Sequence, residues 1–247
     1  MEVHHHSHTA RKNWTHYLWE FLMLFLAVFC GFLAEYQLEH KIEKERGKQY
    51  LKSFVEDLKT DTNIFSGLIK ANERKVAELR GFVECYRAIQ KNPSDSCLLK
   101  LFLASANFPD FIYTDRTLQQ LKNAGGLRLI PPADADSIIE YDKLIRQYQK
   151  IESTSYQEIQ TDLRHSIYSL NNFGATVKSF DSADSGANIY GANKPVMFSN
   201  NKELLNQYFN QLFIYFIGTA GNVEDIGKMK AKAESLIKFF DSKYHFK

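Results

Sequence analysis

The sequence predicts an all-α protein in which a single transmembrane helix near the N-terminus continues into an antiparallel helical bundle. Residues 21–34 form an unbroken apolar run, and residues 18–38 supply the roughly 20 residues that a membrane-spanning helix needs. Further on, apolar side chains recur three and four residues apart over long segments, which is typical of amphipathic helices. We therefore divide the chain into a tail (1–16), a transmembrane helix (17–38), a charged helical stalk (39–50) and a bundle (51–247).

The N-terminal tail is rich in histidine. Imidazoles at this density bind zinc, copper or nickel at neutral pH. The alternative is a tail that meets metal only incidentally, and we favour it because no cysteine or carboxylate cluster completes a closed site. We expect no resident cofactor. The histidines concerned are His4, His5, His6 and His8.

We expect the apolar segment to remain as an anchor rather than to be cleaved as a signal peptide. Cleavage needs small residues just before the cut, and Phe32 stands two residues before the candidate cut after Ala34. A lipoprotein signal fails for the same reason, because Val28 and Phe29 precede Cys30. Aromatic residues flank the segment as they do at membrane interfaces. These are Trp14, Tyr17, Trp19 and Tyr36.

One face of the predicted transmembrane helix carries small or ionisable residues, and the other face carries bulky apolar ones. Helices in lipid associate through small residues that let their backbones approach, and Ala27 and Gly31 have the required spacing of four. The sequence therefore predicts self-association through this face. In the alternative, the helix stands alone and its glutamates reach the lipid headgroups. The face comprises Glu20, Ala27, Gly31, Ala34 and Glu35.

Charge and cysteine content restrict the remaining classes. The formal net charge of the chain is only +2, so we expect no nucleic-acid partner. Cys30 lies in the anchor, and Cys85 and Cys97 are twelve residues apart. That spacing is compatible with a disulfide in an oxidising compartment and equally with two buried thiols.

The first long helix of the bundle is predicted from a stripe about ten turns long. Gly47, Gly67 and Gly81 weaken this helix, each by up to about 1 kcal/mol relative to alanine. Residues 92–95 contain turn-forming side chains that end it. The stripe consists of Leu51, Phe54, Leu58, Asp61, Phe65, Leu68, Asn72, Val76, Leu79, Val83 and Tyr86.

Two short helices are predicted next, and we expect them to cap one end of the bundle. The first covers residues 97–106. The second covers residues 117–124, begins with a side-chain cap from Thr114 or Asp115, and stops at the glycine pair 125–126.

An extended connector at residues 127–132 is predicted to lead to the second long helix. Asp134 and Asp136 are favourable near its N-terminus because of the helix dipole. We expect its stripe to face that of the first long helix. The stripe consists of Ile138, Tyr141, Ile145, Tyr148, Ile151, Ser155, Ile159, Leu163, Ile167, Leu170 and Phe173.

The last long helix is predicted after a polar loop at residues 174–200, with Ser199 or Asn200 as its cap. Residues 218–222 are expected to break or bend it. We find no phosphate-binding glycine motif and no paired histidines after the tail, so we predict no catalytic site and no enzyme.

Two segments resemble a group of bacterial single-span membrane proteins that have no established activity. HHHSHTARKNWTHYLWEFLMLFLAVFCGFLAEYQLEHKIEKERGKQY is similar to the N-terminal signature of that group, and TLQQLKNAGGLRLI is similar to a second segment in its helical domain. The resemblance implies bacterial origin and a single-span architecture, and it transfers no catalytic residues. We expect the protein to lie in the inner membrane.

Three functions are compatible with this architecture. The first is a membrane-anchored scaffold or accessory subunit that self-associates and binds another membrane or periplasmic protein. The second is a helical sensor of a small ligand, and the third is an ion-coupled subunit that uses Glu20 and Glu35. Two basic residues, Arg11 and Lys12, precede the span and five follow it between positions 41 and 52, which favours a cytoplasmic bundle. The N-terminal position of the span resembles an uncleaved export signal, and we expect a periplasmic bundle.

Overall fold

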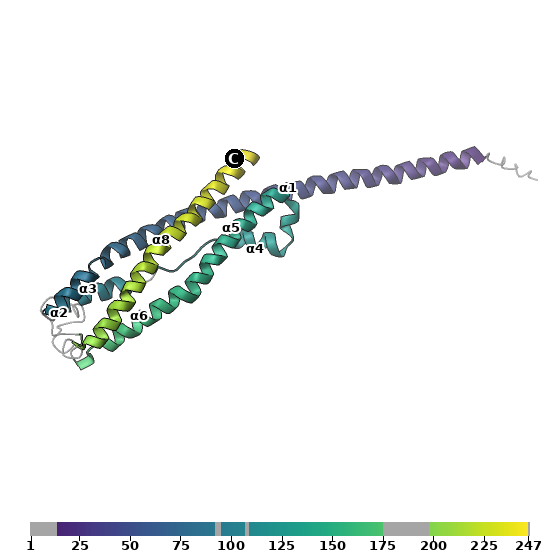
Figure 1. Ribbon diagram of the computed structural model, residues 1–247. Coiled ribbons are helices and arrows are strands. Elements are labelled where there is room, and N and C mark those ends of the chain that lie inside the picture. The colour runs from purple at the N-terminus through teal and green to yellow at the C-terminus, as the bar shows by residue number, and fades with distance from the viewer. Residues whose placement is uncertain (1–13, 92–94, 107–108, 175–197, 247) are drawn as a thin grey trace, which may run out of the picture.

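The structure is a computed structural model that describes residues 14–91, 95–106, 109–174 and 198–246 (Figure 1). Within these ranges the regular elements are helices, apart from one isolated bridge between Asn171 and Phe198. This confirms the predicted all-α class. The elements are α1 (Trp14–Leu79), α2 (Phe82–Lys91), α3 (Asp95–Ala106), α4 (Arg116–Asn123), the 3-10 helix η1 (Gly126–Leu129), α5 (Pro132–Ile151), the π-helical turn η2 (Glu152–Tyr156), α6 (Gln157–Leu170) and α8 (Lys202–Tyr244).

Helix α1 is 66 residues long and has two distinct halves. Its N-terminal half projects away from the other helices, and its C-terminal half packs along α8 (Figure 1). A turn at Arg80 and Gly81 ends α1, so the predicted stripe is divided between α1 and α2. Glycine lowers the stability of a helix interior because it loses more backbone entropy than other residues, which favours a break at this position.

Successive parts of the chain run in alternating directions through the bundle (Figure 1). We call the end where α1 leaves the bundle the proximal end, and the end near α2 the distal end. Helix α3, residues 109–115 and α4 return the chain from the distal to the proximal end, and α5 to α6 and then α8 complete the bundle. The prediction that the short helices cap one end is wrong, because α3 packs in the distal core and α4 in the proximal core. The buried members of the distal core include Leu79, Leu98, Leu101, Tyr156, Leu163, Tyr208, Leu212 and Tyr215.

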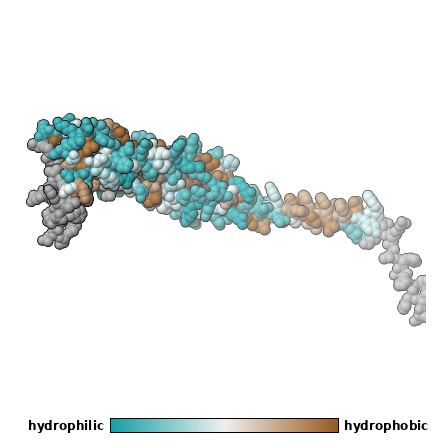
Figure 2. All heavy atoms as spheres, turned by 90° about the horizontal axis from the view of Figure 1, so that it is seen from below, coloured by the Kyte–Doolittle hydropathy of each residue, from teal (hydrophilic) through white to brown (hydrophobic). Residues whose placement is uncertain are grey.

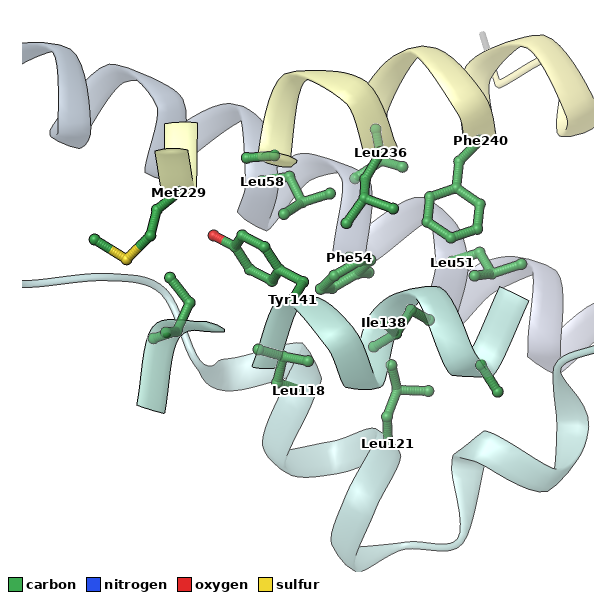
Figure 3. Close-up of a cluster of buried hydrophobic side chains, with 14 of the residues drawn as sticks. Leu51, Phe54, Leu58, Leu118, Leu121, Ile138, Tyr141, Met229, Leu236 and Phe240 are labelled. Carbon is green, nitrogen blue, oxygen red and sulfur yellow. The ribbon is translucent and has the colours of Figure 1, made fainter. Parts of the chain in front are cut away.

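The proximal core is where the two predicted stripes meet (Figure 3). Phe54 of α1 contacts Tyr141 of α5 edge-on at 6.1 Å between ring centroids, and it contacts Phe240 of α8 at 6.2 Å. Edge-to-face aromatic pairs add to the free energy gained from burial. The buried members include Leu51, Leu58, Leu118, Leu121, Ile138, Ile145, Met229 and Leu236.

The π-helical turn η2 changes which residues of the second long helix face the core. A π-helical turn accommodates one extra residue, so the apolar face beyond it is shifted along the sequence. The predicted positions Ile151 and Ser155 are exposed, and Tyr156 is buried in their place. Ile159 is only half-buried, and Phe173 at the end of the stripe is 73% exposed.

The N-terminus of α4 is capped from another helix. Asp115 occupies the cap position but accepts no capping hydrogen bond, contrary to the prediction. Asp57 of α1, which is almost fully buried, accepts a hydrogen bond from the Thr117 backbone N–H at 3.0 Å and from the Arg116 guanidinium at 2.8 Å. The last helix is capped by Asn201, which accepts from two backbone N–H groups, and not by Ser199 or Asn200 as predicted. Helix α8 continues through residues 218–222 without a break.

Gly47 allows α1 to approach η1 closely. A Cβ atom at position 47 would overlap the carbonyl oxygen of Leu129 and lie 3.0 Å from its carbonyl carbon, whereas a Cβ at Gly67 would meet nothing within 4 Å. The connector was predicted to be extended, but its first residues form the 3-10 helix η1, which packs against α1. Gly125 adopts the left-handed conformation (φ 65°) that ends α4, as predicted.

Candidate functional site

The N-terminal half of α1 forms an exposed apolar arm, which we define as residues 14–38. Of the helices in the described ranges, this one is long and apolar enough to cross a bilayer, and none of its most apolar 18-residue window is buried. Figure 2 shows the arm as a brown band that ends where hydrophilic residues begin, before the bundle. Phe32 is 68% exposed. An apolar surface of this extent requires a cover of lipid or protein.

The predicted self-association face is open along the arm. Gly31 has no neighbour within 4 Å of the position that a Cβ atom would occupy. Near the start of the arm, the His16 ring nitrogen lies 3.2 Å from a carboxylate oxygen of Glu20, one helical turn away. Glu35 and the small residues Ala27 and Ala34 are likewise exposed. A second helix can therefore reach every residue of this face.

This face points away from the bundle core. Leu58, which is fully buried in the proximal core, follows Gly31 by 27 residues in the same helix. At 3.6 residues per turn, that separation is about seven and a half turns, which places the two side chains on opposite sides of α1. Two copies that met at Gly31 would therefore carry their bundles on the outside.

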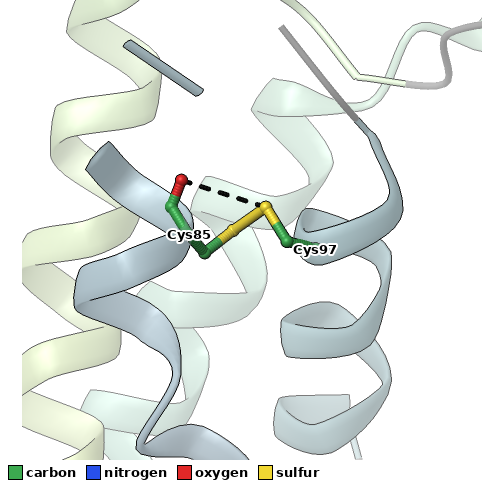
Figure 4. Close-up of a disulfide and its surroundings, with 2 residues drawn as sticks. All are labelled: Cys85 and Cys97. Carbon is green, nitrogen blue, oxygen red and sulfur yellow. Dashed lines mark hydrogen bonds between the residues drawn. A yellow bond between two sulfur atoms is a disulfide. The ribbon is translucent and has the colours of Figure 1, made fainter. Parts of the chain in front are cut away.

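The remaining predicted sites fall into two groups. His4, His5, His6 and His8 lie outside the described residues, and the described residues contain no group of three or more histidine, cysteine or acidic side chains that could hold a metal ion. The sulfurs of Cys85 on α2 and Cys97 on α3 are bonded to each other (Figure 4). Cys30 is a free, exposed cysteine on the apolar arm.

Polar side chains of α1 and α8 are buried beside Tyr156 and Tyr215 of the distal core. Lys75 of α1 is 8% exposed, and its ammonium lies 6.0 Å from the centre of the Tyr215 ring of α8. The hydroxyl groups of Tyr156 and Thr219 lie 2.9 Å apart, and the Thr219 hydroxyl donates to the Tyr215 carbonyl at 2.8 Å. Asn72 of α1 and Asn222 of α8 are also buried.

These buried polar side chains make structural contacts between helices. Burial lowers the pKa of the Lys75 ammonium and raises the pKa of the Tyr215 hydroxyl, because both charged forms lose hydration. The tyrosines therefore act as neutral hydrogen-bonding groups. Lys75 was not predicted from the sequence, although the polar Asn72, three residues earlier on the stripe, indicated that polar side chains enter the core here.

A second buried carboxylate joins residues 109–115 to the proximal core. Asp61 of α1 accepts hydrogen bonds from the Thr114 backbone N–H at 2.6 Å and from the Tyr141 hydroxyl at 2.9 Å. Burial is the largest influence on the pKa of Asp61 and raises it, while the two hydrogen bonds oppose that effect. Asp61 thus fixes residues 109–115 against α1 and α5.

Comparison with known proteins adds no assignment to these sites. No protein-family model, curated protein or solved structure matches the chain.

Proposed function

We propose that this protein is a single-span membrane protein whose helical bundle acts by binding another protein, as a scaffold or accessory subunit, and that it self-associates through its transmembrane helix. The observation that carries the proposal is the continuity of α1. One uninterrupted helix contains both the exposed apolar arm and the residues that form the bundle core. Such a helix holds the bundle at a fixed distance and direction from the bilayer.

Self-association is supported by the position of the small face. The residues that let two backbones approach lie on the side of α1 opposite to the proximal core, so two bundles do not collide when the arms meet. Beyond the arm, this side of α1 carries polar residues such as Gln49, Glu56 and Asn63, all exposed. We therefore place the contact between copies inside the membrane.

We place the bundle in the periplasm of a bacterial cell. The bond between Cys85 and Cys97 supports this side, because structural disulfides persist in oxidising compartments. Five basic residues between positions 41 and 52 argue for the other side, but two glutamates lie among them and long domains cross the membrane despite such charge.

The self-association is tested by replacing one small residue with a large one. Gly31→Leu should abolish the dimer signal of the transmembrane segment in a membrane association assay, because the leucine side chain separates the backbones. Phe29→Leu, also in the arm but outside the small face, is the control and should leave the signal unchanged. An equal signal for the wild type and Gly31→Leu would show that the helices do not pack through this face.

A further inference from the structure

A groove lies at the proximal end of the bundle, between α1, η1 and the last turn of α8. Its volume is about 750 Å³, and its walls are polar on the α1 side. Four of its basic residues, Lys41, Lys44, Lys48 and Arg128, are exposed. Leu51, Leu129, Ile130 and Pro131 form an apolar part of its lining. The groove thus offers cationic and apolar contacts together.

The end of the groove that faces the membrane lies at the depth of lipid headgroups if residues 18–38 cross the bilayer. Lys41 and Lys44 follow Leu38 by one and two turns of the same helix, about 5 and 9 Å along its axis. The headgroup layer on each side of a bilayer is about 5–8 Å thick. Arg128 of η1 lies 4.0 Å from the Glu43 carboxylate, so η1 is at the same depth.

Most of the basic side chains of the groove are available to an anion. The ion pair of Arg128 with Glu43 is long and exposed, and such pairs contribute little stability. Lys243 is different, because it is held 2.6 Å from Asp134, a fully buried carboxylate that also accepts from the Tyr244 hydroxyl. Because Lys243 is paired with Asp134, it is not counted among the available cations. The other four basic residues of the described lining exceed its two acidic residues, Glu43 and Glu45.

We propose that this groove binds the phosphate group of an anionic phospholipid in the leaflet that faces the bundle. Lys44, Lys48 and Arg128 would surround the phosphate, because lysine side chains on a helix point back toward its N-terminus and hence toward the membrane. The inference rests on the proposed membrane span. Lipid bound here bridges α1 and η1, and it sets the depth at which the bundle sits on the membrane.

The test uses the purified full chain in an uncharged detergent and measures the binding of fluorescent phosphatidylglycerol and phosphatidylcholine. The wild type should bind phosphatidylglycerol at least about tenfold more tightly. Each basic residue near an anionic surface is worth about a fivefold change. The triple variant Lys44→Gln, Lys48→Gln, Arg128→Gln should therefore bind phosphatidylglycerol up to about 100-fold more weakly than the wild type and should lose the preference.

The matched control removes three basic residues of α1 and its C-terminal turn that lie far from the groove. Lys70→Gln, Arg74→Gln, Arg80→Gln changes the net charge equally, and all three residues are exposed. It should keep the preference. Glu43→Gln removes an acidic competitor and should strengthen phosphatidylglycerol binding about fivefold. This gain keeps the test decisive if the triple variant unfolds.

Three results would overturn the inference. They are equal binding of the two lipids by the wild type, an equal loss in the control triple variant, and displacement of phosphatidylglycerol by millimolar inorganic phosphate, which would indicate a site for a soluble anion. Extraction of the protein from membranes by alkaline carbonate is measured separately. A protein that resists extraction but shows no lipid preference refutes the groove alone, whereas an extracted protein refutes the membrane span.

Discussion

The close approach of α1 to η1 gives a prediction that uses two glycines of one helix. Gly47 and Gly67 are both interior residues of α1, so replacing either with alanine brings the same gain in helix propensity, about 1 kcal/mol. Their surroundings differ. An added Cβ overlaps the Leu129 carbonyl at position 47 and meets nothing within 4 Å at position 67.

The expected effects have opposite signs. Gly67→Ala should raise the free energy of unfolding by about 0.5–1 kcal/mol, because only the backbone entropy term changes. Gly47→Ala gains the same term but forces η1 away from α1, and overpacking of this kind costs about 1–3 kcal/mol or more. The free energy of unfolding of Gly47→Ala should therefore lie about 1–3 kcal/mol below that of Gly67→Ala.

Urea denaturation of the full chain in detergent, followed by circular dichroism at 222 nm, measures this difference. The comparison is between two alanine variants, so effects of the detergent and of the transmembrane helix cancel. An equal increase in stability for both variants would refute the packing of η1 against α1. It would also remove one wall of the proposed lipid groove.

Three further predictions concern the cores and the arm. Leu58→Ala should lower the free energy of unfolding by about 2–5 kcal/mol, and Ile159→Ala by less, because Leu58 is fully buried and Ile159 is half-buried; urea denaturation of both variants checks the order. Burial lowers the pKa of Lys75 in the folded protein. Between that lowered pKa and about 10.5, the unfolded chain binds more protons at Lys75 than the folded chain does, so the free energy of unfolding rises with pH in this range. Lys75→Met should therefore be more stable than the wild type at pH 7, and its advantage should shrink at pH 10 in the same experiment. Glu20→Gln should leave the dimer signal of the transmembrane segment unchanged or raised, and loss of that signal would show that the carboxylate itself holds the helices together.

The periodicity of the sequence was sufficient to predict the long helices. Residues such as Leu51, Phe54 and Leu58 recur at helical spacing because each must reach the same core, and the structure buries all three. The exposed arm was equally clear, because its apolar run lacks the polar face that a packed helix needs.

Contacts between distant segments were not accessible in the same way. The cap of α4 comes from Asp57, which lies 60 residues before its partner Thr117, and no local pattern reveals such a pair. The π-helical turn moved Tyr156 into the core in place of Ile151 and Ser155, because one inserted residue shifts every later position of a helical stripe. The role of Gly47 was also hidden, since a glycine that permits a close approach resembles one that merely weakens a helix.

The candidate functional sites were likewise predictable from the sequence only in part. Ala27 and Gly31 could be identified from their spacing alone. Their orientation relative to the bundle depends on the continuity of α1 from Gly31 to Leu58, which only the structure supplies. The proximal groove combines residues from α1, η1 and α8, and it could not be assembled from the sequence without knowing that these elements meet.

The most direct test of the membrane span is the labelling of two single-cysteine variants in intact spheroplasts with a cysteine reagent that cannot cross the inner membrane. Both variants carry Cys30→Ala and serines at positions 85 and 97, and each adds one cysteine, at Thr9 before the span or at the exposed Glu158 on α6. We predict that Glu158→Cys is labelled in intact spheroplasts and that Thr9→Cys is labelled only after lysis. Equal labelling of the two sites in intact spheroplasts would contradict the account, because it would place both ends of the apolar arm on one side of the membrane.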